Sequence, residues 1–236
     1  MDLTEALRTT GAVRDFERTP VPRDVVYDLL ETARFAPSGG NRQCWRVVVV
    51  EDPATRRAVR DVYLIGWHEY LAQAHAGLVP FAPAGDRAAA SEAIAGAGAL
   101  AAASPPGPGG FAEHLDEVPV LLVVLADLRY VAATDLDAER YTLVGGASVY
   151  PFCWSILLAA HDVGLAGVLT TMATRGEAAL REVLGLEAHL AIASVIALGY
   201  PTARATRLRR GPVERFTTID RADGAPLSRG GVEDSR

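Results

Sequence analysis

Short apolar runs along the chain predict four strands. Residues 46–51 hold four consecutive valines before the turn Asp52-Pro53, and residues 118–126 are continuously apolar. Both runs are typical of strands that are buried on both faces. Residues 167–171 and 190–198 are predicted as two further strands.

Apolar residues at intervals of three and four predict the helices. A first helix runs to Thr9, because Asp2 and Glu5 have the spacing of a capping box. It stops at the following glycine, so the loop 10–16 is free to face a ligand. A second amphipathic helix begins near Pro22.

Three more helices are expected, over residues 55–70, over the long apolar stretch 143–161, and over residues 174–184. The last of them begins with a second capping box, Thr174 with Glu177, and stops at the glycine that follows it.

Residues 72–110 are rich in alanine, glycine and proline, and we interpret them as a lid or loop region with a short helix around 88–94. Residues 1–220 form a single domain, and 221–236 a flexible tail. Strands mixed irregularly with helices favour an α+β sheet domain over a regular βαβ series. No GxGxxG follows a strand, which weakens a Rossmann interpretation.

Composition narrows the function classes. The chain has 236 residues, is 50% hydrophobic and carries a net charge of -6, so one core is expected and a general nucleic-acid binder is disfavoured. Its two cysteines lie outside any CxxC spacing, and its five histidines show no HExxH pattern, so neither a disulfide framework nor a metal site is expected. No serine stands in a GxSxG elbow, which leaves a hydrolase without support.

The first ten residues and the longest apolar stretch indicate the cellular compartment that we expect. The first ten residues lack the basic start and apolar core of a secretory signal, so we expect a cytoplasmic protein. Residues 141–160 are long enough to span a membrane, yet they contain two glycines and a proline and end at His161-Asp162. A buried core or dimer-interface helix is the better interpretation, with no membrane involved.

The segment 36–45, APSGGNRQCW, holds the most distinctive chemistry. Its small residues let backbone amides approach a ligand, and Asn41 and Gln43 add two side-chain amides. Taken alone, the segment is equally compatible with an ordinary turn before a strand.

Five blocks in order resolve that ambiguity: TTGAVRDF, APSGGNRQCW, GGASVYP, GLAGVLTT, and LGYP followed by RRGPVE. Together they cover nearly the whole chain, and the sequence resembles the nitroreductase family. The resemblance implies a mixed β-sheet flanked by helices, an intertwined homodimer, two FMN sites at the subunit interface, and a C-terminal arm that wraps the partner.

The resemblance also implies the site. By this resemblance, the flavin phosphate and ribityl chain are bound by Thr10, Gly11, Ala12 and Arg14. The arginine and serine that usually begin this motif are replaced here. Arg8 is a possible substitute.

At the C-terminal end, Arg210 matches the family's basic residue at the phosphate, and a guanidinium suits that role because it makes paired hydrogen bonds. Arg209 is the alternative candidate for this phosphate contact, and Arg204 matches no family position. A solvated turn is the plain alternative for this basic cluster.

Two more blocks complete the implied flavin site. One lines the flavin from the partner subunit and comprises Pro37, Ser38, Gly39 and Asn41, braced by Gln43. The other donates backbone hydrogen bonds to the flavin ring and comprises Gly167, Val168, Leu169 and Thr170. Such donors stabilise negative charge that develops during transfer.

The implied activity is hydride transfer from NADH or NADPH through FMN to a small electron-poor acceptor, such as a nitroaromatic or a quinone, without a protein acid or base. One alternative is a dedicated biosynthetic flavin dehydrogenase or reductase whose pocket is shaped by Trp67, Tyr70 and Phe81. Another is a flavin-binding protein without turnover, a possibility that the replaced residues Thr10 and Gly11 raise.

Overall fold

The computed structural model describes residues 2–103, 110–204 and 208–229. One four-stranded sheet lies at its centre, with the order β1 (Trp45–Val49), β2 (Val120–Asp127), β4 (Leu190–Gly199), β3 (Ala166–Thr170). Neighbouring strands pair antiparallel, and Ala12 adds a parallel bridge to Gly167 on the β3 edge. The α+β class is confirmed.

Strand β2 explains how the sheet builds two cores. Alternate residues of a strand point to opposite faces. Val120, Leu122 and Val124 accordingly pack into one hydrophobic cluster, while Leu121 and Val123 pack into the other. The prediction of burial on both faces therefore holds for this central strand.

The same prediction is wrong for β1. This strand lies at the edge of the sheet and is only partly buried: Trp45 is buried, Val47 and Val48 are half-buried, and Val49 is 41% exposed. Four valines in a row do not distinguish an edge strand from a central one, because the distinction depends on which strand pairs with which.

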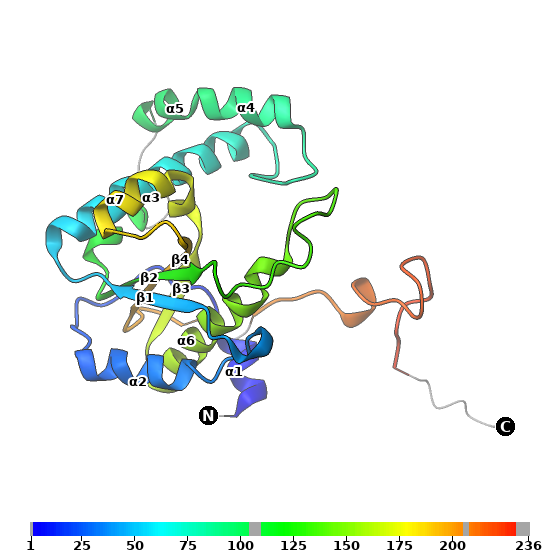
Figure 1. The fold of residues 1–236 in the computed structure, drawn as a ribbon, viewed down its shortest axis with the longest axis horizontal. Helices are drawn as coiled ribbons and strands as arrows, with labels where there is room; N and C mark the ends of the chain where they lie inside the picture. Colours follow the sequence, from blue (N-terminus) through cyan, green and yellow to red (C-terminus); the bar gives the residue numbers. More distant parts are fainter. Residues whose placement is uncertain (1, 104–109, 205–207, 230–236) are drawn as a thin grey trace.

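Helices cover both faces of the sheet (Figure 1). The cluster on one face includes α2 (Arg23–Ala33) and α6 (Tyr150–Asp162), and the cluster on the other includes α3 (Pro53–His75) and α7 (Glu177–Leu184). α1 (Leu3–Thr9) contacts α6, and α4 (Arg87–Ala95) and α5 (Ala97–Ala103) contact α3.

The region predicted as a lid or loop is more helical than expected. α3 extends to His75, α4 covers the short helix expected around 88–94, and α5 was not predicted. Alanine has the highest helix propensity, which explains the extra helix. The proline and glycine stretch 104–109 lies outside the described residues.

Two predicted helix starts also differ. Residues Val144–Ser148 form a 3₁₀ turn, so α6 starts only at Tyr150. The second capping box is wrong: Thr174 lies in a 3₁₀ turn and its Oγ1 donates to the carbonyl of Thr171. The first capping interaction is present, because Asp2 Oδ1 accepts a 2.9 Å hydrogen bond from the Glu5 amide.

One segment, Val144–Asp162, is long and apolar enough to cross a membrane by length and composition. Its residues Phe152, Cys153 and Ile156 are buried in the core of this fold. Beyond β4, residues 208–229 form an arm that extends away from the body and exposes Phe216 to solvent.

Candidate functional site

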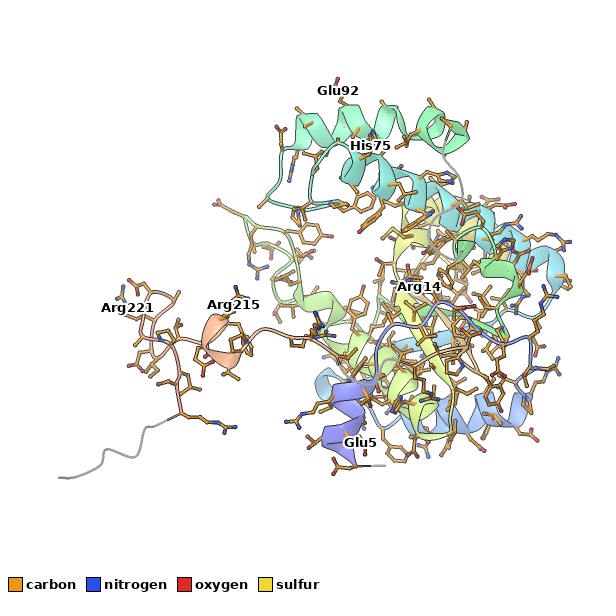
Figure 2. The ribbon with its side chains drawn as sticks, turned by 180° about the vertical axis from the view of Figure 1, so that it is seen from behind. Glu5, Arg14, His75, Glu92, Arg215 and Arg221 are labelled. Carbon is orange, nitrogen blue, oxygen red and sulfur yellow. The ribbon has the colours of Figure 1, made fainter. Side chains whose placement is uncertain are left out.

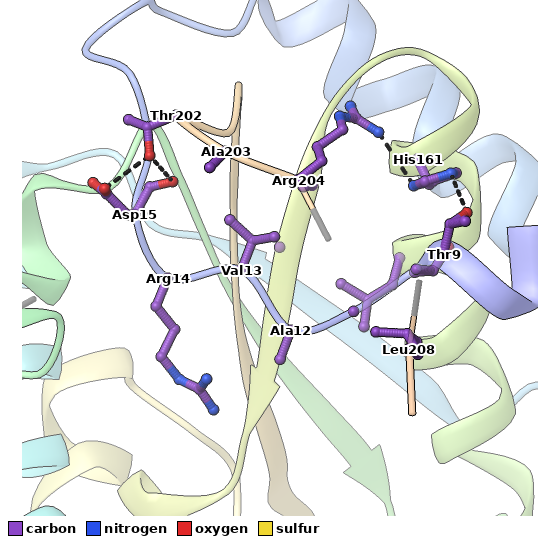
Figure 3. A pocket seen from close by; sticks show the side chains of 15 residues that line it. Thr9, Ala12, Val13, Arg14, Asp15, His161, Thr202, Ala203, Arg204 and Leu208 are labelled. Carbon is purple, nitrogen blue, oxygen red and sulfur yellow. Dashed lines mark hydrogen bonds between the residues drawn. The ribbon is translucent and has the colours of Figure 1, made fainter. Parts of the chain in front are cut away.

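The segment after α1 runs beside the edge strand β3 and forms one side of a pocket of about 320 Å³ (Figure 3). The Val13 amide donates a 2.9 Å hydrogen bond to the carbonyl of Gly167, which fixes the segment to the strand. The pocket is lined by Thr9, Thr10, Gly11, Ala12, Val13, Arg14, Asp15, Leu157, His161, Ala166, Gly167, Thr202, Ala203, Arg204 and Leu208.

Two polar side chains of this pocket have no partner among the residues that the structure describes. Thr10 is only 9% exposed, and its Oγ1 makes no hydrogen bond within the part of the chain that the structure describes. An unsatisfied buried hydroxyl costs about 1–3 kcal/mol, so this position favours a bound partner. Arg14 is exposed at the same pocket, and no ion pair of its guanidinium is found among residues 2–103, 110–204 and 208–229.

On the opposite wall of the pocket, consecutive hydrogen bonds connect Arg204, His161 and Thr9. Arg204 Nη1 lies 3.2 Å from His161 Nδ1, and His161 Nε2 lies 3.2 Å from Thr9 Oγ1. Thr9 Oγ1 in turn donates to the Glu5 carbonyl at 2.8 Å. Because a guanidinium only donates, Nδ1 must accept and the ring proton must sit on Nε2.

Electrostatics favour this neutral form of His161. Burial lowers the pKa of the imidazole, and the Arg204 guanidinium lowers that pKa further, whereas Glu5 and Asp162 act in the opposite direction. Arg204 also donates to the carbonyls of Gly164 and Leu165, so it ties the turn between α6 and β3 to the segment after β4.

Strand β3 connects this pocket to a second one. Gly167 lines the first pocket, and Thr171, which follows β3, lines a cavity of about 900 Å³. Four residue steps of a strand span roughly 13 Å. A Cβ on Gly167 would lie 2.3 Å from the Ala197 carbonyl oxygen, so close packing against β4 requires glycine here.

Leu169 and Thr170 lie between the two pockets and are half-buried. Thr170 Oγ1 lies 3.4 Å from Tyr63 Oη. Together with the first pocket, this arrangement brings Thr10, Gly11, Ala12, Arg14 and the β3 segment to one side of the molecule.

The segment from Pro37 to Gln43 lies elsewhere. Gly39 donates its amide to Ser148 Oγ at 3.0 Å, just before α6 begins, whereas the first pocket contains His161 at the other end of α6. Thirteen residues of helix span roughly 20 Å. One chain therefore does not bring this segment to the first pocket.

The same segment holds an unusual backbone. Asn41 and Gln43 have φ of 53° and 47°, in the left-handed region that is rare for residues other than glycine. Internal bonds support the turn, since Ser38 Oγ accepts from the Gln43 amide at 3.0 Å and the Gln43 side chain donates to Asn41 Oδ1 at 3.2 Å. Backbone strain of this kind clusters at functional sites.

The C-terminal arginines occupy the start of the arm. Arg209 and Arg210 are exposed, and Arg210 Nη1 donates to the Arg209 carbonyl at 2.8 Å. Neither lines the first pocket, whereas Arg204 does. Sequence reasoning missed Arg204 because no motif position matched it, and its only signal was its place three residues after LGYP.

Of the three aromatic residues expected around a lid pocket, Phe81 lines the larger cavity. Trp67 and Tyr70 do not line it and stack on each other with ring centroids 5.4 Å apart.

Other titratable groups play structural roles. Burial raises the pKa of both thiols, Cys44 and Cys153, which disfavours the reactive thiolate. Asp127 is buried and ionised, because Arg129 lowers its pKa to about 2. Within the described ranges, no group of three or more His, Cys, Asp or Glu side chains could hold a metal ion.

Comparisons with known proteins bear on this geometry. A family model described as the nitroreductase family matches residues 7–200. An NADH dehydrogenase of Thermus thermophilus is 29% identical over 91% of this chain and 94% of its own length. Iodotyrosine deiodinase 1 of Homo sapiens is 26% identical over 90% of this chain, which spans 66% of that protein.

Solved structures show the same fold. A BluB-like flavoprotein from Clostridium difficile 630 superposes with a TM-score of 0.67 at 19% identity, covering 94% of this chain and 100% of that one. The NADPH:FMN oxidoreductase from Vibrio harveyi, solved with NAD+, gives a TM-score of 0.63 at 16% identity, covering 92% and 76%.

Proposed function

The chain belongs to the nitroreductase family, and we propose that it is an FMN-dependent oxidoreductase that passes hydride from NADH or NADPH to a small electron-poor acceptor, such as a nitroaromatic or a quinone. The family match supports an oxidoreductase, and among the relatives are an NADH dehydrogenase and an NADPH:FMN oxidoreductase. The observation that carries the flavin assignment is the first pocket. Among the described residues, the buried Thr10 hydroxyl there has no hydrogen-bond partner and the nearby Arg14 has no ion pair.

These residues fit a phosphate-bearing cofactor. A phosphate accepts hydrogen bonds and carries negative charge, so it satisfies both the Thr10 hydroxyl and the Arg14 guanidinium. Gly11 and Ala12 leave their side of the pocket open to the ribityl chain. We assign Arg209 and Arg210 to the same phosphate from the family resemblance, since neither lines the pocket within one chain.

FMN supplies two-electron hydride chemistry when it is bound. The chain's own contribution is orientation and electrostatics, since the backbone of Gly167 to Thr170 lies along the path from the phosphate pocket to the larger cavity. With a nitroarene as the acceptor, one NAD(P)H and one proton yield the nitroso compound, water and NAD(P)+.

A homodimer completes this proposal. Pro37, Ser38, Gly39, Asn41 and Gln43 lie roughly one α6 length from the first pocket, so they reach a flavin only in a second copy of the chain. Large apolar side chains are exposed on the elements that would form the interface: Leu3, Leu7, Tyr150, Trp154, Val213 and Phe216. We assign the enzyme to the cytoplasm.

The test is a steady-state assay of the FMN-loaded protein with NADH or NADPH and, in turn, nitrofurazone, a quinone and oxygen as acceptors. Ping-pong kinetics with the nitroaromatic or the quinone are expected. Turnover with none of them would instead favour a dedicated metabolic substrate or a non-catalytic flavin carrier.

A further inference from the structure

The larger cavity lies where β3 ends, next to the segment assigned to the flavin ring. Three parts of the chain line it: the end of α3 with the loop 78–86, residues of α4 from Arg87 to Ile94, and residues 171–175 after β3. Tyr141 lines it from a fourth segment. A molecule bound there would adjoin the flavin ring, so this cavity is the place for the acceptor.

One wall of the cavity is fixed by a buried amide. Gln73 is 1% exposed, and its Oε1 accepts a 3.0 Å hydrogen bond from the Phe81 amide while its Nε2 donates to the Glu69 carbonyl at 3.1 Å. Phe81 has a φ of 56°, a conformation that is rare for a bulky residue. Gln73 thus holds an aromatic ring at the cavity in a backbone conformation it would not adopt alone.

A guanidinium stands over that ring. The Arg175 guanidinium carbon lies 5.3 Å from the Phe81 ring centroid, and Arg175 Nε donates to Glu69 Oε2 at 2.5 Å. The Arg175 side chain is 44% exposed, and no partner of its Nη groups is found in the described parts of the chain. Its position is fixed through Nε, which leaves two parallel N–H donors available.

Two arginines line the cavity and can bind an anion through their guanidinium groups. Arg87 and Arg175 line it as cations, and no ion pair of Arg87 is found among the described residues. The one carboxylate in the lining, Asp86, already accepts from the amides of Ala88 and Ala89 at 3.0 and 3.1 Å as the cap of α4. Arg175 is already paired with Glu69 through Nε, so Arg87 and the Nη groups of Arg175 are the donors left to meet a ligand.

We propose that the acceptor is an aromatic carboxylate, whose ring packs against Phe81 and whose carboxylate pairs with Arg175. A planar guanidinium with two parallel donors matches a carboxylate better than it matches a neutral polar group. The inference rests on the proposed function, since it names the substrate class of the same flavin site.

The experiment compares two probes of equal shape, 4-nitrobenzoate and 4-nitrobenzamide, which share the ring and the nitro group and differ in charge. Equilibrium binding to the FMN-saturated protein is measured by calorimetry for wild type and Arg175→Met. We expect the dissociation constant for 4-nitrobenzoate to rise roughly tenfold and that for 4-nitrobenzamide to stay within twofold.

A matched control exists elsewhere in the chain. Arg34 also pairs with a carboxylate, Glu31, at 2.5 Å and stands over a ring, Phe35, at 4.5 Å, but it does not line the cavity. Arg34→Met should leave both dissociation constants unchanged. The double variant Glu69→Gln with Arg175→Met removes the carboxylate left unpaired, and it should keep the tenfold loss.

Three results would overturn the inference: equal losses for both probes, a loss that disappears in the double variant, or no loss at all. A rise in the KM for NADH without any change in 4-nitrobenzoate binding would assign Arg175 to the phosphates of the donor instead. If the protein does not bind FMN, the proposed function fails, and calorimetry on the flavin-free protein still decides whether Arg175 selects the carboxylate.

Discussion

At the scale of single residues, the neighbours Thr9 and Thr10 have opposite environments. Thr9 Oγ1 contacts both the Glu5 carbonyl and His161, whereas the buried Oγ1 of Thr10 lacks a partner among the described residues. No sequence pattern distinguishes these two threonines, because the difference arises from which way each side chain leaves the end of α1. The family motif proposes Thr10 as a site position, and its unpartnered hydroxyl supports that proposal.

This contrast predicts that replacing Thr10 raises the stability of the flavin-free protein and lowers its affinity for FMN. Thr10→Val replaces an unsatisfied buried hydroxyl with a methyl group of similar size, so stability without flavin should rise by about 1 kcal/mol. FMN affinity should fall at the same time, since the phosphate loses a donor. Calorimetric unfolding and flavin fluorescence titration measure the two effects.

Thr9→Val is the control, and it should lower the melting temperature because it removes bonds that are already made. A Thr10→Val protein that is less stable yet binds FMN normally would show that the Thr10 hydroxyl is structural.

His161 predicts a dependence on pH. Its pKa in the folded protein lies below the ordinary value of 6.5, so the unfolded chain takes up a proton at a pH where the folded protein does not. The stability contributed by neutral His161 is therefore fully present above about pH 6.5 and is lost as the pH falls below that value. FMN affinity should follow, because protonation breaks the Arg204 contact in the pocket wall.

His161→Gln should remove this component from the difference in melting temperature between about pH 7.5 and about pH 5.5, while the other histidines stay unchanged as an internal reference. An identical difference in wild type and variant would contradict the assignment.

At the scale of elements, local sequence patterns predicted the four strands and most helices. They failed where the structure of a segment depends on the elements that pair or pack with it. The edge position of β1, the late start of α6 and the unexpected α5 depend on pairing and packing that no window of sequence contains. Gly185, with φ of 62° after α7, was predictable because only its own backbone is involved. The sequence motif identified the segment 37–43, but it did not predict the left-handed backbone conformations of that segment.

Those turns give a test at the element scale. Asn41 has a φ of 53°, which glycine adopts without strain, so Asn41→Gly should keep the fold while removing the side chain proposed to face the flavin. We expect roughly tenfold weaker FMN binding and a nearly unchanged melting temperature. Asn41→Ala should lower both, because the left-handed backbone then costs about 1–2 kcal/mol.

Unchanged FMN binding by the glycine variant would mean that the segment is only a turn entering β1.

At the scale of the whole molecule, the arm is the feature that the body of the fold does not explain. It extends away from the body in Figures 1 and 2, and its residue Phe216 is 72% exposed. Large apolar side chains that are exposed together on one surface are typical of an interface. The family blocks anticipated a dimer, but the separation between the segment 37–43 and the first pocket could be seen only in the fold.

We predict that the protein is a homodimer and that Phe216→Asp weakens it together with flavin retention. Light scattering coupled to gel filtration should give twice the mass of one chain for wild type and a lower mass for the variant. Tyr27→Asp is the control, since Tyr27 is 68% exposed on α2, outside the proposed interface. A wild-type monomer that retains FMN would contradict the prediction.

The most direct test of the central claim is an anaerobic titration of the FMN-loaded protein with NADH and with NADPH, followed by the absorbance of the flavin. We expect at least one donor to bleach the flavin with one equivalent per site, and a nitroaromatic acceptor to restore the absorbance. A protein that fails to bind FMN, or whose bound FMN neither donor reduces, would contradict it.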